Sequence, residues 1–504
     1  MPKHSHSNRH SRSHRRTRLA TAIAAAATLT TGLLTLTTAP ATAAPTAAPT
    51  PLSPDEADFN GDGTPDTAIS APTATVAGKA EAGQLVIAYG GGATTTPRTL
   101  QTLSQNTPGI PGTAEKGDSF GADTAYGDFN GDYYDDLAVS APGEDVGTDT
   151  NGGTVQILWG SPDGLKRAVT VTDPRPTRHD HFGSSLEAAD FENDGGGDLA
   201  IGSGSGAATI DVLKGGFTDS GVPKARYTIR PAIQSGDGTG PLNLHSGDVN
   251  GDERADLIVD GFADDGEGYN ANFMIPGTPD GLSVPNAHRL PGGLITDVGD
   301  TNEDGYGDIV IGLTWDEGIE GAHKGGTVHI VHGNPNGPYG SDQAITQDSA
   351  GVPGAGETND AFGGELDLGD INGDGHLDLV VGAPGENLDG FTDAGAVTVL
   401  YGAADGSGIT TQGAAMLSQN TPGVPNSNEN HDFFGQDVHI DDLNRDGRGD
   451  LVVGASGENT ENGAVYVLNS RADGTFSSPT GGIYPSSASV STSGRPRLGV
   501  NIAD

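Results

Sequence analysis

A nine-residue pattern of oxygen-bearing side chains recurs seven times along the 504-residue chain. Asp, Asn or Glu fills its first, third, fifth and ninth positions, and Gly fills the sixth position in most copies. Carboxylates that converge from a flexible loop suit a hard cation, and Ca²⁺ accepts such an all-oxygen cage whereas Mg²⁺ demands stricter octahedral geometry. The pattern therefore predicts calcium sites, up to seven in number.

Each predicted site has four side-chain ligands. In chain order these are Asp58, Asn60, Asp62 and Asp66; Asp128, Asn130, Asp132 and Asp136; Asp190, Glu192, Asp194 and Asp198; Asp248, Asn250, Asp252 and Asp256; Asp300, Asn302, Asp304 and Asp308; Asp370, Asn372, Asp374 and Asp378; and Asp442, Asn444, Asp446 and Asp450. The loops that begin at Asp128, Asp190 and Asp248 depart most from the pattern. Tyr133 and Glu253 replace the expected Gly in two of them, and the third has Glu192 at its third position.

Two other interpretations of the loops compete with this one. An EF-hand would place a bidentate Glu at position twelve, but here that position is Ile or Val, as in Ile69 and Val381, inside a predicted strand. Acidic turns that bind nothing are the second alternative. Seven recurrences in the same register argue against it.

The regions between the loops have the pattern of short β-strands. An apolar run follows each loop, as in Leu137–Val139 and Leu379–Val381, and a second alternating run comes later, as in Thr154–Trp159 and Ala396–Tyr401. These runs are rich in β-branched residues and show no helical period. One unit repeated through residues 55–504 predicts an all-β repeat architecture.

Residues 1–44 have the composition of an export signal peptide. A basic start is followed by the uncharged apolar stretch Leu19–Thr38, and Ala41-Thr42-Ala43 precedes Ala44 as a small-residue cleavage site. The pair Arg15-Arg16 is compatible with twin-arginine export as well as with the general secretory route. The alternative to a signal peptide is an uncleaved membrane anchor. Residues 45–54 are predicted to be a disordered linker rich in Ala, Thr and Pro. We therefore expect a secreted, extracellular protein.

The charge balance narrows the classes of partner. The chain has 68 acidic and 25 basic side chains, for a formal net charge of −43, and contains no Cys. Loss of the signal peptide, with its six basic and no acidic residues, would give −43 − 6 = −49. This charge disfavours nucleic acid and anionic membrane surfaces as partners. The lack of Cys excludes a disulfide framework, a zinc–thiolate site and a Cys nucleophile.

Further motifs flank the loops. Four Phe-Gly pairs each stand eight residues before a loop, namely Phe120-Gly121, Phe182-Gly183, Phe362-Gly363 and Phe434-Gly435. Ends similar to Gly-Ala-Pro follow the first strand, as in Ser140-Ala-Pro142 and Gly382-Ala-Pro384. With these motifs the chain resembles the FG-GAP repeat family, which includes the seven-bladed β-propeller of the integrin alpha-subunit head and bacterial relatives. The fourth and fifth repeats lack Phe-Gly.

The resemblance spans about residues 55–504 and implies a seven-bladed β-propeller whose loops join the first two strands of each blade. It also implies an additional main-chain metal ligand at the seventh loop position. The residues concerned are Thr64, Tyr134, Gly196, Arg254, Tyr306, His376 and Arg448.

The first repeat lacks the strand that should precede its loop. Residues 497–503, Arg-Leu-Gly-Val-Asn-Ile-Ala, look like an extra copy of that strand. We therefore expect a C-terminal strand to complete the first blade and close the ring, which also hides edges that an open array would expose.

A ligand is expected on the face opposite to the metal loops, where the connections are long and differ from blade to blade. Trp315, with His323 nearby, is the only Trp on such a connection and is our candidate ligand contact, although packing between blades would also explain it. Trp159 ends a strand and is expected to be structural.

Three functional classes fit these patterns. The favoured one is a non-enzymatic, calcium-stiffened recognition or adhesion module, expected to be a monomer, that binds an extracellular protein or glycan. The alternatives are a secreted polysaccharide-acting enzyme that uses acidic residues on the loop face, and a purely structural envelope protein. The sequence contains no His-Glu-x-x-His, the commonest metalloprotease motif.

Overall fold

The computed structural model describes residues 56–90, 99–176, 181–204, 208–235, 239–264, 270–339, 343–471, 474–478 and 481–503. The chain separates into two units, residues 1–47 and 48–504, and every described residue belongs to the second unit. The predicted signal peptide, residues 1–44, and the predicted linker, residues 45–54, lie outside the described residues. Within the described ranges, no helix is long and apolar enough to cross a membrane.

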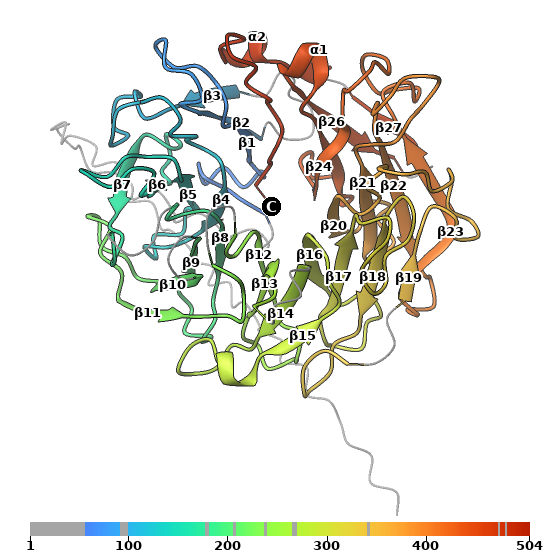
Figure 1. Cartoon of the computed structure of the whole chain (residues 1–504), viewed down its shortest axis with the longest axis horizontal. Coiled ribbons are helices and arrows are strands. Elements are labelled where there is room, and N and C mark those ends of the chain that lie inside the picture. The colour runs from blue at the N-terminus through green and yellow to red at the C-terminus, as the bar shows by residue number, and fades with distance from the viewer. Residues whose placement is uncertain are drawn as a thin grey trace, which may run out of the picture. The chain divides into compact units, whose positions relative to one another are not determined.

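The described elements are almost all strands, and they form seven antiparallel sheets, or blades (Figure 1). Blade one contains β1 (Thr67–Ala71), β2 (Gln84–Tyr89) and β3 (Thr99–Leu103). Blade two contains β4 (Thr124–Gly127), β5 (Asp136–Ala141), β6 (Thr154–Trp159) and β7 (Arg167–Val171), and blade three contains β8 (Leu186–Ala189), β9 (Asp198–Ser203), β10 (Thr209–Lys214) and β11 (Ala225–Ile229). Blade four contains β12 (Leu244–Gly247), β13 (Asp256–Phe262), β14 (Asn270–Ile275) and β15 (His288–Leu290).

Blade five contains β16 (Ile295–Gly299), β17 (Asp308–Leu313), β18 (Thr327–Val331) and β19 (Gln343–Ile345), and blade six contains β20 (Glu365–Gly369), β21 (Asp378–Ala383), β22 (Ala396–Gly402) and β23 (Ile409–Leu417). Blade seven contains β24 (Phe434–Asp441), β25 (Asp450–Ala455), β26 (Ala464–Ser470), β27 (Phe476–Ser477) and β28 (Gly482–Ile483). Three single-turn helices, η1 (Val284–Asn286), α1 (Glu458–Glu461) and α2 (Pro485–Ala488), complete the described elements.

The strands of each blade pair in chain order, except that β27 and β28 of blade seven both pair with β26. Figure 1 shows β4, β8, β12, β16, β20 and β24 nearest the centre of the ring. These inner strands surround a cavity of about 660 Å³. The predicted seven-bladed all-β propeller is therefore confirmed.

The core lies between neighbouring blades. The second strand of most blades is buried along its whole length, as in β5 and β21, because both of its faces are covered. One apolar cluster joins Leu85 and Ile87 of blade one to Leu137 and Val139 of blade two. Burial of each such side chain stabilises the fold by about 1.5–3 kcal/mol relative to an exposed one.

Each of the four Phe-Gly pairs connects its blade to the one before it. The N–H of Phe434 donates to the Ala394 carbonyl at 3.1 Å, and the Phe434 side chain is fully buried. Gly395, next to Ala394, has a φ of +83°, and a Cβ there would lie 2.2 Å from the Phe434 carbonyl oxygen. Gly is thus required twice over, by the backbone conformation and by the close approach.

The C-terminal segment makes the same contact for blade one. Leu498 donates its N–H to the Asn462 carbonyl at 3.2 Å, and a Cβ on Gly463 would lie 2.3 Å from the Leu498 backbone. Leu498-Gly499 is therefore the counterpart of Phe-Gly. Residues 499–503 pair with β1 through an isolated antiparallel bridge, Ile69 to Ile502, and neighbouring backbone hydrogen bonds. The predicted closure is confirmed, but the closing segment is less regular than the predicted strand.

Candidate metal loops and the opposite loop face

Six of the acidic loops join the first and second strands of their blades, the first loop precedes β1, and all seven share one backbone conformation. Positive φ values between 56° and 89° occur at the fourth position, in Gly61, Gly131, Asn193, Gly251, Glu303, Gly373 and Arg445, and at the sixth position, in Gly63, Tyr133, Gly195, Glu253, Gly305, Gly375 and Gly447. Tyr133 and Glu253 thus adopt the left-handed conformation that Gly adopts elsewhere. Their departure from the sequence pattern leaves the backbone of the loop unchanged.

The carboxylate at the first position holds each loop together. In every loop it accepts the N–H groups of the fifth and sixth residues at 2.7–3.1 Å; in the sixth loop, Asp370 accepts from Asp374 and Gly375. The fifth-position Asp accepts the N–H of the seventh residue in most loops, including that of Thr64 and that of His376. The seventh-position carbonyls implied by the family resemblance therefore lie in the same turns.

The ninth-position Asp is the most buried part of each loop. These seven side chains are at most 2% exposed, and each accepts an N–H from the last residue of the blade's third strand, or of β2 in blade one, or from just beyond it, as Asp136 does from Gly160 at 2.8 Å. Burial raises the pKa of Asp66 to about 8 and that of Asp136 to about 9. A buried carboxylate is costly to ionise unless a positive charge lies beside it.

Unpartnered oxygens show that the loops fit a cation. Asn130 Oδ1, Asp136 Oδ2 and Asp198 Oδ2 are buried and accept no hydrogen bond. In the third loop Asp190, Glu192 and Asp198 each place a carboxylate oxygen within 4.8 Å of the others. All of these donors are oxygens, as a hard cation requires. Two of the three loops that depart most in sequence thus provide donors of the expected kind.

Basic side chains already neutralise part of the charge in some loops. Lys214 Nζ lies 2.7 Å from Glu192 Oε1, and Lys224 Nζ lies 2.7 Å from Asp194 Oδ2, so the third loop has two ammonium partners. Arg254 and Arg448 pair with the fifth-position Asp of the fourth and seventh loops at 2.9 and 3.1 Å. A cation in the third loop would therefore compete with Lys214.

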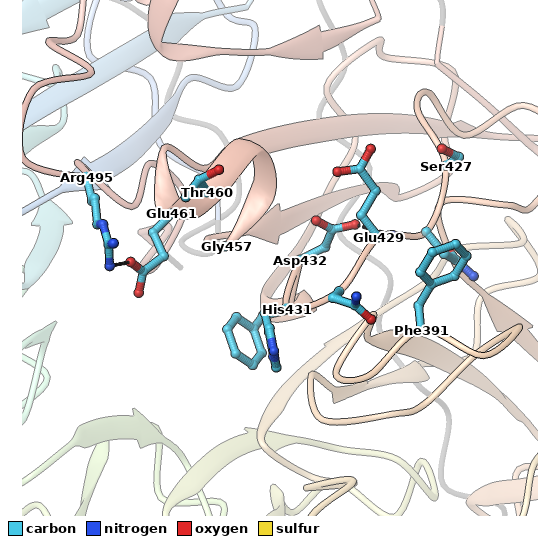
Figure 2. Close-up of a pocket in the computed structure, with 12 residues that line it drawn as sticks. Phe391, Ser427, Glu429, His431, Asp432, Gly457, Thr460, Glu461 and Arg495 are labelled. Carbon is cyan, nitrogen blue, oxygen red and sulfur yellow. Dashed lines mark hydrogen bonds and ion pairs between the residues drawn. The ribbon is translucent and has the colours of Figure 1, made fainter.

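The face opposite to the loops carries a cavity of about 750 Å³ between blades six and seven (Figure 2). Its wall combines the aromatic rings of Phe391 and Phe433 with the polar side chains of Glu429, His431 and Asp432. Arg495, paired with Glu461, closes one end. Sequence reasoning missed this cavity because its walls come from four separate connections.

The candidate ligand contacts lie elsewhere on this face. Trp315 is 40% exposed, and its Nε1 donates to Asn270 Oδ1 of blade four at 2.7 Å, so it both packs between blades and reaches solvent. His323 is exposed on the same β17–β18 connection. Neither residue lines the cavity. Trp159 is 3% exposed, as expected of a structural residue.

This geometry defines a seven-bladed propeller with an acidic loop in every blade, and the comparisons with known proteins agree. The family model described as FG-GAP repeat matches residues 120–158, 362–400 and 434–468, and each match begins at a Phe-Gly pair. The chain is 28% identical over 258 residues to integrin alpha-PS2 of Drosophila melanogaster, covering 51% of this chain and 14% of that protein. Integrin alpha-6 of Homo sapiens is 30% identical over 202 residues, covering 37% and 15%.

A second group of relatives is enzymatic by name. Phosphatidylinositol-glycan-specific phospholipase D of Bos taurus is 29% identical over 174 residues, covering 34% of this chain and 20% of that protein. The chain therefore contains FG-GAP repeats and is similar to integrin alpha chains over part of its length. Its matches span about a fifth or less of these relatives' lengths.

Proposed function

We propose that this protein is an exported, calcium-binding recognition module that presents the connections opposite to its metal loops to an extracellular protein or glycan. The observation that carries the proposal is the difference between the two faces of the propeller. One face repeats a single loop seven times with the same left-handed residues. The other face varies from blade to blade and contains the large cavity.

Calcium is proposed for the loops because their donors are all oxygens and some of these oxygens are buried without a partner. The bound ion would supply positive charge beside the ninth-position Asp residues. It would thereby stabilise each turn and the inner end of each blade. Its role is structural in this proposal, and recognition is left to the opposite face.

The opposite face has the side chains that a ligand site uses. Val146, Trp315 and Phe391 are large apolar residues exposed by 40%, 40% and 37%, and all three lie on connections between second and third strands. Phe391 stands at the cavity, where carboxylates and an imidazole provide hydrogen-bond partners. Aromatic surface beside polar groups on a rigid scaffold suits a protein or a glycan.

Binding arrays test the proposal. Labelled residues 45–504 would be applied to arrays of glycans, cell-wall polymers and matrix proteins, in 1 mM calcium and again in chelator. The proposal expects calcium-dependent capture by one ligand class. If protein shown by circular dichroism to be folded bound to no array, the proposal would be overturned.

Single substitutions then locate the site. Phe391→Ala and Trp315→Ala remove exposed aromatic surface from the proposed face, and at least one is expected to weaken capture about tenfold or more. Tyr339→Ala is the matched control, because Tyr339 is 67% exposed but lies between β18 and β19, on the side of the metal loops. Equal effects of all three variants would show that the opposite face is not the binding surface.

A further inference from the structure

A second group of acids lies on the face opposite to the metal loops. Glu357 and Asp360 belong to the connection from β19 to β20, and Glu386 follows β21. Each of the three offers a carboxylate oxygen within 4.8 Å of the other two. We call Glu357, Asp360 and Glu386 the acidic trio.

Asp360 and Glu386 of the acidic trio are buried, whereas Glu357 is exposed. Asp360 is fully buried and Glu386 is 4% exposed. Asp360 Oδ2 accepts the N–H of Glu357 at 2.6 Å, but Asp360 Oδ1 has no hydrogen-bond partner. In the described part of the chain, no Lys, Arg or His forms an ion pair with these three carboxylates. A buried carboxylate oxygen without a partner is costly, and a bound cation would offset that cost.

A neighbouring amide also leaves an oxygen open, as its counterparts in the other two clusters do. Gln347, 3% exposed, donates its Nε2 to Glu386 Oε2, whereas its own Oε1, like that of Gln105 and that of Gln419, is buried without a partner. Burial raises the pKa of Asp360 to about 6 and that of Glu386 to about 7. The buried donors left open are therefore oxygens, the atoms that hard cations bind.

A related cluster in blade seven shows how buried Glu oxygens can be satisfied without a cation. A Gln donates to a Glu 39 residues later in three places, Gln105 to Glu144, Gln347 to Glu386 and Gln419 to Glu458. In blade seven, Glu458 also accepts from the Tyr466 hydroxyl and from Asn459 Nδ2, at 3.2 and 2.8 Å. Its carboxylate is therefore fully satisfied by neutral donors.

Blade six has no Tyr hydroxyl within the described ranges that could donate to Glu386 in this way. The residue at the position of Tyr466 is Thr398, since Tyr466 pairs with Val453 and Thr398 pairs with Val381 at the corresponding points of the two blades. A Thr hydroxyl cannot extend as far as a phenol. Among the described residues, only this copy of the cluster brings three carboxylates within 4.8 Å of one another.

We propose that the acidic trio binds a divalent cation of the calcium type, at a site separate from the seven loops. The ion would tie the connection that enters blade six to the connection that leaves β21. Asp360 stands two residues before Phe362, so the ion would also fix the start of the Phe-Gly contact with blade five. This proposal does not depend on the recognition role of the protein.

The test counts calcium ions bound per chain, by equilibrium dialysis of residues 45–504 against 1 mM calcium followed by metal analysis. Asp360→Asn combined with Glu386→Gln removes the charges and preserves the shapes. This double variant is expected to bind one ion fewer than the natural chain. The matched control Glu458→Gln, in the satisfied cluster of blade seven, is expected to bind the same number.

An unchanged count in the double variant would overturn the proposal. Glu357→Gln guards against a folding defect, because Glu357 is exposed, and it is expected to weaken one site about tenfold in a calcium titration. The experiment also separates this proposal from that for the loops. If the loops bound no calcium, the total would fall, but the difference of one ion between the natural chain and the double variant would remain.

Discussion

Ser70 and Asn501, which are 431 residues apart, are joined by two hydrogen bonds. The amide N–H of Ser70 donates to the Asn501 carbonyl at 2.9 Å, and the Ser70 hydroxyl donates to the Asn501 side chain at 3.3 Å. Ser70 lies in β1 of the first blade, and Asn501 lies in the segment that follows the last blade. The two ends of the ring are thus held by contacts within one sheet.

Loss of this closure should destabilise the protein. Leu498 is fully buried against blade seven and blade one, so Leu498→Ala is expected to lower the free energy of unfolding by about 2–5 kcal/mol. Deletion of residues 498–504 should cost more. Urea unfolding in calcium measures both effects, with Thr492→Ala, at an exposed position of the same C-terminal segment, as control. If the deletion left the urea midpoint of unfolding unchanged, the closing segment would not be needed for stability.

Substitutions at two Gly residues of the β21–β22 connection can distinguish the energetic cost of a steric clash from the cost of a left-handed backbone. Gly390 and Gly395 have φ values of +90° and +83°, but a Cβ on Gly390 meets nothing within 4 Å. Gly390→Ala should cost about 1–2 kcal/mol for the left-handed conformation alone. Gly395→Ala should cost clearly more, since its Cβ would lie 2.2 Å from the Phe434 carbonyl oxygen. If thermal unfolding showed the same loss of stability for both variants, the role assigned to the Phe-Gly contact would be contradicted.

Removal of calcium should lower the stability of the whole ring. With a dissociation constant of about 0.1 mM and about 1 mM calcium, each occupied loop contributes about 1.4 kcal/mol, and seven contribute roughly 10 kcal/mol. Chelator is therefore expected to lower the melting temperature strongly. Asp370→Ala should abolish one site and reduce this difference, whereas Glu320→Gln, an exposed acid outside the loops, should not. Identical melting curves with and without calcium would refute the structural role.

Asp260 gives a prediction of pH dependence. It is 1% exposed at a strand position that is Ser or Gly in the other blades, and neither of its carboxylate oxygens has a hydrogen-bond partner among the described residues. Burial raises its pKa well above the ordinary value. A raised folded-state pKa favours folding below the unfolded pKa of about 4, and this contribution is lost as the pH rises through the folded value.

Asp260→Asn should therefore raise the free energy of unfolding at pH 7, and the gain should shrink as the pH falls towards 4. Denaturant unfolding at several pH values measures the trend. Asp264→Asn, on an exposed neighbour, is the control that should show no such trend. A gain from Asp260→Asn that is the same at pH 4 and pH 7 would contradict the assignment.

The loops were the part of the protein most accessible to sequence reasoning. Their ligands lie within nine residues of one another, so spacing alone identified Asp58 and its counterparts, and the family resemblance placed the loops between the first and second strands. The pattern could not show that Tyr133 and Glu253 adopt positive φ, because the surrounding hydrogen bonds to the first-position Asp impose that conformation. It also could not show the Lys214 partner of Glu192, which comes from another strand.

The acidic trio and the cavity were missed for a related reason. Glu357 and Glu386 meet only because β20 and β21 return the chain to the same face. A signal was nevertheless present, since a Glu three residues before an Asp recurs as Glu115, Glu357 and Glu429, each ahead of a Phe-Gly pair. A search for repeated polar residues outside the loops would have found it.

The closure of the ring also imposes an order in time. During synthesis the chain emerges from its N-terminus, so β1 exists long before residues 498–503 that cover its inner edge. Until then, the backbone groups of Ala68 and Ser70 that later bond to Ala503, Asn501 and Gly499 are an open strand edge, which can pair with other chains. Residues 498–503, which are made after every described strand, thus decide when the first blade ceases to be a site of aggregation.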